Sequence, residues 1–285
     1  MHKINQLTKD EFPELLKEIP DQPKTLYLQG NLPSYEENKF LCVVGSRKYS
    51  NYGKEVCEKL ISGLRGYPIV IVSGLALGID GIAHRAALDA GLKTVAVPGS
   101  GLNPNVLYPS THRGLAQKIL ENDGALLTEF EPNFHATVWS FPQRNRIMAG
   151  LSHAILIIEA ELKSGTLITS RLATDYNRDV LTVPGSIFSK NSEGPNMLMR
   201  LGATPITSSK ELLEALGFNE EATATKNYSD CSELEIKVLK LLEVPISRDE
   251  LLRTLEIPVS EANALISILE IKGFIKESAG EIHLV

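Results

Sequence analysis

A chain of 285 residues, of which 43% are apolar and 22% charged, is long enough for one large domain or for a medium domain with a small partner. No apolar run approaches the length of about eighteen residues that suggests a membrane span. The first residues lack the apolar stretch of a secretory signal, and the three cysteines form no CxxC pair. We therefore expect a cytoplasmic protein with no membrane partner, no disulfide framework and no cysteine zinc site.

The net charge of −6 is unevenly distributed along the chain. Residues 229–285 hold eleven acidic and six basic side chains, which leaves the first 228 residues nearly neutral. Within that first part, Arg47 adjoins Lys48 and Arg144 stands close to Arg146, each pair beside small polar residues. Because phosphate binding needs only a local basic patch, the net charge neither excludes nor indicates a nucleic-acid partner.

Residues 1–39 are polar and interrupted by prolines, and they predict a lead-in with a short helix around Phe12–Lys17 and extended chain over Thr25–Gln29. From residue 40 onward, short apolar runs alternate with stretches of helical periodicity. The predicted strands are 41–44, 69–72, 94–97, 125–128, 154–158 and 180–183, and the predicted helices include 53–64, 79–90, 111–120 and 167–176. Such alternation indicates a Rossmann-like α/β domain over 40–216, with a doubly wound, mostly parallel sheet.

The end of the chain predicts a second, smaller domain. Residues 217–229 have no apolar pattern and are typical of a linker, while 230–285 show three amphipathic helices followed by a two-stranded hairpin. That order is the outline of a winged-helix-like domain. Its third helix carries Glu261 and Glu270 and no basic residue, so we expect it to serve protein contacts or regulation rather than DNA binding.

The residues with chemical potential follow the predicted strands. In an open parallel sheet, ligands bind beyond the carboxyl ends of the strands. Five of these positions carry glycine with small polar residues, namely Gly45-Ser46-Arg47, Ser73-Gly74, Pro98-Gly99-Ser100, Ser164-Gly165-Thr166 and Pro184-Gly185-Ser186. Glycine lets a ligand approach the backbone, and hydroxyls and free N–H groups donate to anions. Together with the basic residues, these turns predict an anionic ligand.

Neither a P-loop nor a dinucleotide fingerprint occurs, and we expect no cofactor. The six histidines have no metal-ligand spacing, and Glu159 and Glu161 point opposite ways on a strand, so we expect neither a metal site nor catalytic carboxylates. Asp80 and His84 are typical of a network at a helix start, with Asp80 interacting with the N-terminus of its own helix.

Several motifs occur in the order and spacing of one known family. They are Gly45-Ser46-Arg47, Ser73-Gly74-x-Ala76-x-Gly78-Ile79-Asp80-x-x-Ala83-His84, Phe141-Pro142-x-Arg144-Asn145-Arg146-Ile147, Glu159-Ala160-x-x-x-Ser164-Gly165-Thr166-Leu167-x-Thr169 and Val183-Pro184-Gly185. The chain thus resembles the DprA/Smf DNA-processing family over about residues 10–215. The resemblance implies a homodimer that binds and protects single-stranded DNA and hands it to a RecA-type recombinase during natural transformation, without catalytic turnover.

The resemblance places the family's anion site at Gly45, Ser46 and Arg47, with Ser73, Gly74, Arg144 and Arg146 beside it. Bases of a single strand also need faces on which to stack, and Trp139 is the preferred candidate over Phe134 and Phe141. The expected nucleic-acid contacts are Gly45, Ser46, Arg47, Lys48, Ser73, Gly74, Trp139, Arg144, Arg146, Ser164, Gly165 and Thr166. The alternatives are that the arginines form structural ion pairs and that the aromatic side chains belong to the core.

Two other functions remain open from the sequence. A LOG-like nucleotide N-glycosidase would need an acidic residue and an arginine beside a P-G-G-x-G-T turn, of which this chain has only Lys163-Ser164-Gly165-Thr166. A small-nucleotide sensor would use the same pocket without DNA.

Overall fold

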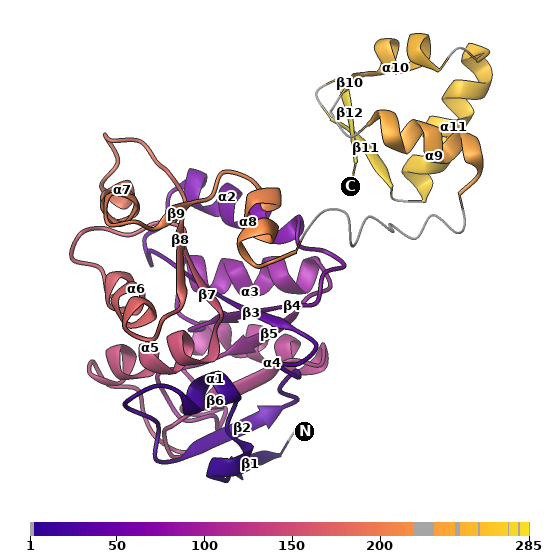
Figure 1. Ribbon diagram of the computed structural model, residues 1–285. Coiled ribbons are helices and arrows are strands. Elements are labelled where there is room, and N and C mark those ends of the chain that lie inside the picture. Colours follow the sequence, from indigo (N-terminus) through magenta and orange to yellow (C-terminus); the bar gives the residue numbers. More distant parts are fainter. Residues whose placement is uncertain are drawn as a thin grey trace. The chain divides into compact units, whose positions relative to one another are not determined.

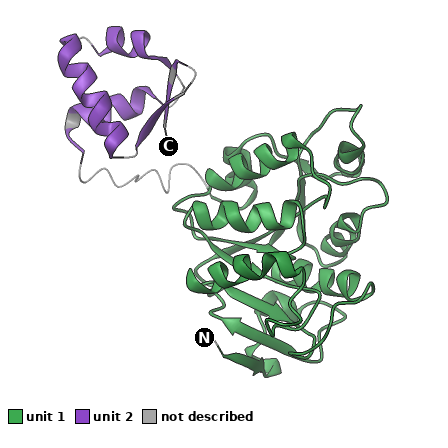
Figure 2. Cartoon of the chain, turned by 180° about the vertical axis from the view of Figure 1, so that it is seen from behind, with its two compact units in different colours: residues 1–220 green, residues 221–285 purple. Residues whose placement is uncertain are grey.

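The chain divides into two compact units, residues 1–220 and 221–285 (Figure 2). The computed structural model describes residues 3–218, 231–242, 246–255, 257–272, 274–278 and 280–284. Most of the predicted linker, its residues 219–229, lies outside the described residues. Within the described part of the chain, no helix is both long enough and apolar enough to cross a membrane.

The first unit is built on a nine-stranded, mostly parallel sheet, as predicted (Figure 1). Its parallel strands are β3 (Lys39–Val44), β4 (Ile69–Ser73), β5 (Lys93–Ala96), β6 (Ala125–Thr128), β7 (Ala154–Ile157), β8 (Asp179–Thr182) and β9 (Thr204–Pro205). The strand order is β1-β2-β6-β5-β4-β3-β7-β8-β9. Strands β4, β5 and β6 follow one another on one side of β3, and β7, β8 and β9 follow one another on its other side. The direction of the strand order therefore reverses between β3 and β7.

Helices cover both faces of this sheet (Figure 1). One face packs against α2 (Asn51–Ser62), α3 (Ile79–Asp89), α4 (Arg113–Glu121) and α8 (Ser209–Ala215). The other packs against α1 (Glu14–Lys17), α5 (Ser140–Leu151), α6 (Thr166–Asp175) and α7 (Glu193–Arg200). In β3, Leu41 and Val43 belong to the first core while Phe40 and Cys42 belong to the second. Burial on both faces explains why the strand is continuously apolar.

The segment before residue 40, expected to be a lead-in, contributes two strands to the sheet. Strand β2 (Leu26–Gly30) pairs antiparallel with β6, and β1 (Ile4–Leu7) pairs antiparallel with β2. The expected extended chain is thus a sheet strand. The reason is that Leu26 and Tyr27 are both buried, so this stretch contributes to the core instead of running over the surface.

The second unit contains the three helices and the hairpin expected from the sequence. They are α9 (Glu233–Leu241), α10 (Arg248–Thr254), α11 (Val259–Ile271), β11 (Ile275–Ser278) and β12 (Glu281–Leu284). A short strand, β10 (Ile246–Ser247), pairs with β12 and completes a three-stranded sheet. This unit has its own apolar core, centred on Val238, Leu251 and Ile266. Its kinship with winged-helix domains stays a prediction.

Candidate nucleic-acid interface

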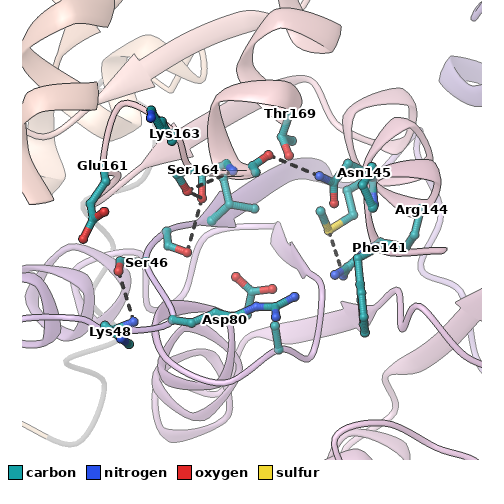
Figure 3. A pocket seen from close by; sticks show the side chains of 18 of the residues that line it. Ser46, Lys48, Asp80, Phe141, Arg144, Asn145, Glu161, Lys163, Ser164 and Thr169 are labelled. Carbon is teal, nitrogen blue, oxygen red and sulfur yellow. Dashed lines mark hydrogen bonds between the residues drawn. The ribbon is translucent and has the colours of Figure 1, made fainter. Parts of the chain in front are cut away.

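A pocket of about 530 Å³ opens in the first unit beyond the carboxyl ends of β3 and β7 (Figure 3). This is the point where the strand order reverses, and the loops that leave two neighbouring strands in opposite directions separate there. The loop after β3, the loop after β7 and the first turns of α5 contribute most of the lining. The position is the one expected from the sequence for a bound ligand.

The loop after β3 brings Gly45, Ser46, Arg47 and Lys48 to the pocket, as predicted. A Cβ at position 45 would come within 2.7 Å of the Ile79 side chain, so the loop can pass this close to α3 only with glycine. The Arg47 guanidinium stands over the Phe141 ring, 5.0 Å from its centroid. Arg47 and Lys48 are exposed, and no described carboxylate forms an ion pair with either, so both charges are available to an anion.

A buried carboxylate fixes the end of this loop. Glu159 is 2% exposed and accepts hydrogen bonds from the backbone N–H of Ser50 at 2.9 Å and from Asn191 Nδ2 at 3.3 Å. The same Asn191 amide donates to the carbonyl of Lys48 at 2.9 Å. Ser50 in turn caps α2 by accepting from the N–H of Gly53. The sequence did not predict this anchoring role of Glu159, because Ser50 and Asn191 lie 109 and 32 residues away from it.

The loop after β7 supplies Ser164, Gly165 and Thr166, as predicted. Ser164 Oγ accepts from the N–H of Thr166 at 3.2 Å, and Thr166 Oγ1 donates to the carbonyl of Gly45 at 3.3 Å. The two glycine turns therefore touch each other. Helix α6 begins at Thr166, so its first N–H groups lie at the pocket and favour an anion. Lys163 and Glu161 both lie at the rim.

Arg144 lines the pocket but is almost fully buried, with 4% of its surface exposed. Its Nη1 donates to the carbonyl of Val97 at 2.6 Å. Asp80 lies in the first turn of α3, and its Oδ2 accepts from the N–H of Gly74, in the loop before that helix, at 3.1 Å. Burial raises the pKa of Asp80, although the Arg144 guanidinium opposes this effect, and burial lowers the pKa of Arg144. The two charges therefore partly compensate each other beneath the pocket.

Ser73 and Gly74, which we expected to contact DNA, are buried and lie outside the pocket lining. Ser73 Oγ donates to the carbonyl of Val43 at 2.7 Å and so links β4 to β3. At Gly74, an added Cβ would be 1.6 Å from Arg144 Nη1. These two residues give the site its shape and do not face a ligand, because the turn after β4 folds under Arg144.

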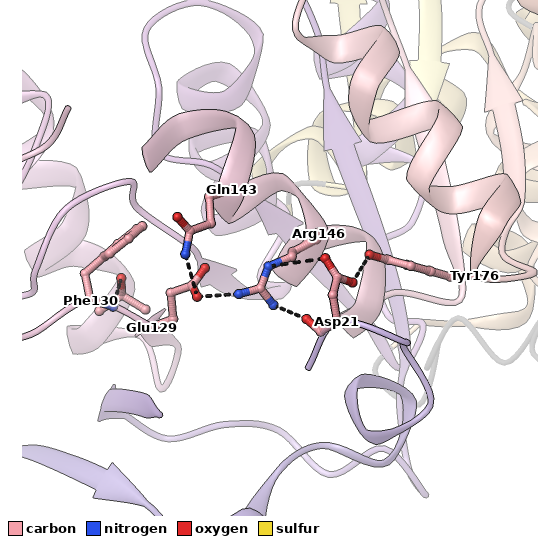
Figure 4. Close-up of polar contacts among 7 residues, drawn as sticks. Asp21, Glu129, Phe130, Gln143, Arg146 and Tyr176 are labelled. Atoms are coloured by element: carbon pink, nitrogen blue, oxygen red, sulfur yellow. Dashed lines mark hydrogen bonds and ion pairs between the residues drawn. The ribbon is translucent and has the colours of Figure 1, made fainter. Parts of the chain in front are cut away.

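The contacts of Arg146 also differ from the DNA contact that the sequence predicted for it (Figure 4). Its side chain is 12% exposed, forms ion pairs with Glu129 and Asp21, and donates to the carbonyl of Asp21. Gln143 Nε2 donates to Glu129 Oε2 at 3.0 Å, and the Tyr176 hydroxyl donates to Asp21 Oδ1 at 2.6 Å. Arg146 is not among the lining residues. The alternative of a structural ion pair, left open by the sequence, describes this residue.

Trp139 lies just before α5 and is 55% exposed. Its ring makes edge-on contacts with Phe130 and Phe134, at centroid distances of 5.8 and 5.6 Å. Trp139 does not line the pocket, whereas its neighbour Val138 and Phe141 do. Phe141 lies between Arg47 and Tyr108, whose ring centroid is 5.5 Å away. The pocket therefore has an aromatic wall, with a further exposed indole close to it in sequence.

His84 takes no part in a network with Asp80 at the helix start. Thr94 Oγ1 donates to the carbonyl of Ile71, so it accepts from His84 Nδ1 at 2.7 Å. The Nε2 atom of His84 is buried without a hydrogen-bond partner among the described residues, and burial lowers the pKa of His84 to about 3. Across the described ranges, no group of three His, Cys, Asp or Glu side chains could hold a metal ion.

Comparison with known proteins gives a consistent result. The sequence model of the family described as DNA recombination-mediator protein A matches residues 3–217. DNA processing protein DprA of Streptococcus pneumoniae is 43% identical over 209 residues, which are 73% of this chain and 72% of that protein. Protein Smf of Escherichia coli is 41% identical over 221 residues, 76% of this chain, and the chain spans only 57% of that protein.

Two solved structures share the fold of the first unit. The X-ray structure of DprA from Streptococcus pneumoniae has a TM-score of 0.69 at 40% identity and covers 74% of each chain. A structure described as showing the single-stranded DNA binding mode of DNA processing protein A from Helicobacter pylori has a TM-score of 0.68 at 30% identity. It covers 75% of this chain and 96% of that chain.

Proposed function

Because the chain belongs to the DNA recombination-mediator protein A family, which includes the DprA and Smf relatives, we propose that it binds single-stranded DNA at the 530 Å³ pocket. In this role it acts as a recombination mediator without chemical turnover. It protects the strand and delivers it to a RecA-type recombinase, and it does so as a homodimer in the cytoplasm.

The observation that carries the proposal is the pairing of free positive charge with an aromatic face at one pocket. Arg47 and Lys48 are exposed and have no ion-pair partner among the described residues, and Arg47 stands over Phe141, which lines the pocket. Phosphates of a single strand can be neutralised by the two cations while a base packs against the ring. Hydroxyls of Ser46, Ser164 and Thr166 can add donors from the two glycine turns.

Nothing in the geometry favours the N-glycosidase alternative. Asp80 is the most deeply buried acid of the lining, and its carboxylate is held by the N–H of Gly74 and by Arg144 instead of facing a bound sugar. Glu161, the other lining acid, is exposed at the rim. Incubation with nucleoside monophosphates tests this reading directly, and the mediator proposal expects no released base.

Fluorescence anisotropy of labelled oligo-dT across a salt series tests the proposal. We expect Arg47→Ala to weaken binding roughly 10- to 100-fold, the effect of losing one charge-assisted hydrogen bond of about 1.5–3 kcal/mol. The slope of log affinity against log salt concentration is negative, and its magnitude should decrease by about 0.7, the value for one phosphate contact on a single strand. Arg65→Ala is the matched control, since Arg65 is an exposed arginine ahead of β4, at the opposite edge of the sheet.

The wild type should prefer oligo-dT to a duplex of the same length. Equal loss of affinity in both arginine variants would contradict placement of the strand at this pocket. Calorimetry with mononucleotides separates the sensor alternative, because a sensor would bind them as tightly as it binds a long oligonucleotide. Light scattering of the purified chain tests the homodimer, and RecA loading onto oligo-dT in its presence tests delivery.

Trp139 provides a second readout, because it is the only tryptophan in the chain and more than half of its surface is exposed. If a base stacks on the indole, oligo-dT should quench its fluorescence in proportion to binding, while Trp139→Leu should weaken binding by about 1–3 kcal/mol. Binding without any quenching would restrict the stacking face to Phe141.

A further inference from the structure

A second pocket, of about 230 Å³, lies in the first unit where β3, β7 and β8 begin. These strands are parallel neighbours, so their first residues share the sheet edge opposite to that of the DNA pocket. Three basic side chains meet there, one from the start of each strand: Lys39, His153 and Arg178. None of them was singled out from the sequence, because Lys39 is more than a hundred residues from the other two, and β7 and α6 lie between His153 and Arg178.

The protonation of His153 is determined by its neighbour in β3. The backbone N–H of His153 donates to the carbonyl of Phe40 at 2.8 Å, and the N–H of Phe40 donates to His153 Nδ1 at 2.9 Å. In the neutral ring the proton must therefore be on Nε2, which makes that atom a donor. Burial lowers the pKa of His153, and the nearby charges of Lys39 and Arg178 lower it further.

Arg178 is incompletely satisfied. Its side chain is 8% exposed, and its Nη2 donates to the carbonyl of Leu15 and to Glu18 Oε2, both at 2.9 Å. Its Nε is buried without a hydrogen-bond partner among the described residues. Glu18 is 61% exposed, so water weakens its compensation of the buried guanidinium.

The remaining lining residues leave the pocket predominantly basic, with an apolar wall. Lys39 is exposed and forms no ion pair with a described residue, and Asp179 is the single acidic residue of the lining, also exposed. Leu15 and Leu216 supply an apolar wall from α1 and from the residue after α8. Three donors, two of them cationic, thus line the pocket with one rim carboxylate, while Glu18 pairs with Arg178 from outside the lining.

We propose that this second pocket binds a phosphate group carried by a small molecule, held by Lys39, His153 and Arg178. Planar guanidinium, ammonium and imidazole donors together suit the three oxygens of a phosphate. At about 30 Å³ per water the pocket has the volume of roughly eight waters, and it is smaller than the 300–1,000 Å³ typical of drug-sized ligands. A phosphate ester with a short organic part, packed against Leu15 and Leu216, fits this space.

Calorimetry of the full chain with inorganic phosphate and with glycerol 3-phosphate tests the proposal. We expect saturable binding, about 10-fold weaker in Lys39→Gln, as one lost charge-assisted contact of roughly 1.4 kcal/mol requires. The binding that Lys39→Gln weakens should persist in Arg47→Ala, which alters the DNA pocket, and in Lys118→Gln, which removes an exposed lysine of α4. In the wild type, NMR of the histidine rings should show that added phosphate raises the pKa of His153.

Absence of saturable binding would overturn the proposal, and so would binding that Arg47→Ala abolishes and Lys39→Gln does not. Oligo-dT distinguishes the source of the phosphate. A small-molecule site predicts that Lys39→Gln leaves oligo-dT affinity unchanged. A loss of oligo-dT affinity in Lys39→Gln, without binding of either small phosphate, would assign the pocket to the DNA backbone and refute the small-molecule site.

Discussion

Replacing Arg146 by alanine removes the centre of the ion-pair network in Figure 4. Glu129, whose side chain is 9% exposed, would keep the hydrogen bond from Gln143 but lose Arg146, the one cation that forms an ion pair with it among the described residues. Asp21 is 58% exposed, so its ion pair with Arg146 contributes little to the free energy of unfolding, about 0–1 kcal/mol. Breaking a buried pair costs about 3–5 kcal/mol, and protonation of the stranded carboxyl limits the loss. We therefore expect the free energy of unfolding to fall by about 3 kcal/mol at neutral pH.

Urea titration followed by Trp139 fluorescence measures this loss in the first unit alone, because that unit holds the only tryptophan. Burial already raises the pKa of Glu129 against the opposing effect of Arg146, so the variant's pKa should rise further. Its native state then binds more protons than the unfolded chain, and the stability gap to the wild type should shrink as the pH falls towards 5. Glu129→Gln in the variant background should restore part of the stability.

The same variant tests the role expected from the sequence. If Arg146 is purely structural, the folded variant should bind oligo-dT as the wild type does. Unchanged stability together with a roughly 10-fold loss of oligo-dT affinity would refute the reasoning and make Arg146 a phosphate contact.

Three further predictions concern stability and loop position. Burial lowers the pKa of His84 to about 3, so the native state binds fewer protons than the unfolded chain between that pH and the ordinary pKa of 6.5. The free energy of unfolding should therefore fall by up to about 1.4 kcal/mol per pH unit as the pH drops through this window. His84→Gln should reduce this pH dependence in urea titrations. Gly74→Ala places a Cβ 1.6 Å from Arg144 Nη1 and should cost about 1–3 kcal/mol in thermal unfolding, whereas Gly114→Ala, with nothing within 4 Å, should cost nothing. Glu159→Gln releases the loop that carries the two cations, so oligo-dT affinity should fall a few-fold with no change in salt slope; a changed slope would mean that Glu159 acts on the DNA itself.

Much of the fold was predictable because the central strands are buried on both faces. A run such as Leu41–Val44 must then be apolar throughout, and that pattern is visible in one sequence. Helix α5 was not predicted. Its buried residues include Ser140, Arg144 and Asn145, so the side facing the core and pocket has no apolar stripe in its first turns.

The site was predictable where it depends on loops that follow strands. Gly45, Ser46, Arg47 and the Ser164–Thr166 turn were expected at one sheet edge, and the structure brings them into contact. The role of Arg146 was not predictable, because its partner Asp21 lies 125 residues away. Tertiary packing determines which arginine pairs with a carboxylate and which stays free. The spacing of residues along the sequence does not predict it.

The two edges of the nine-stranded sheet are unequal, and this limits how copies of the chain can join through their backbones. One edge ends in β9, two residues long and closed by Pro205, which has no N–H to donate. The other ends in β1, whose four residues Ile4–Leu7 pair only with β2. Among the described residues of this sheet, a strand can therefore be added only at β1. Two copies meeting there would close on themselves as a pair, and a sheet with one blunt end cannot extend into a fibre.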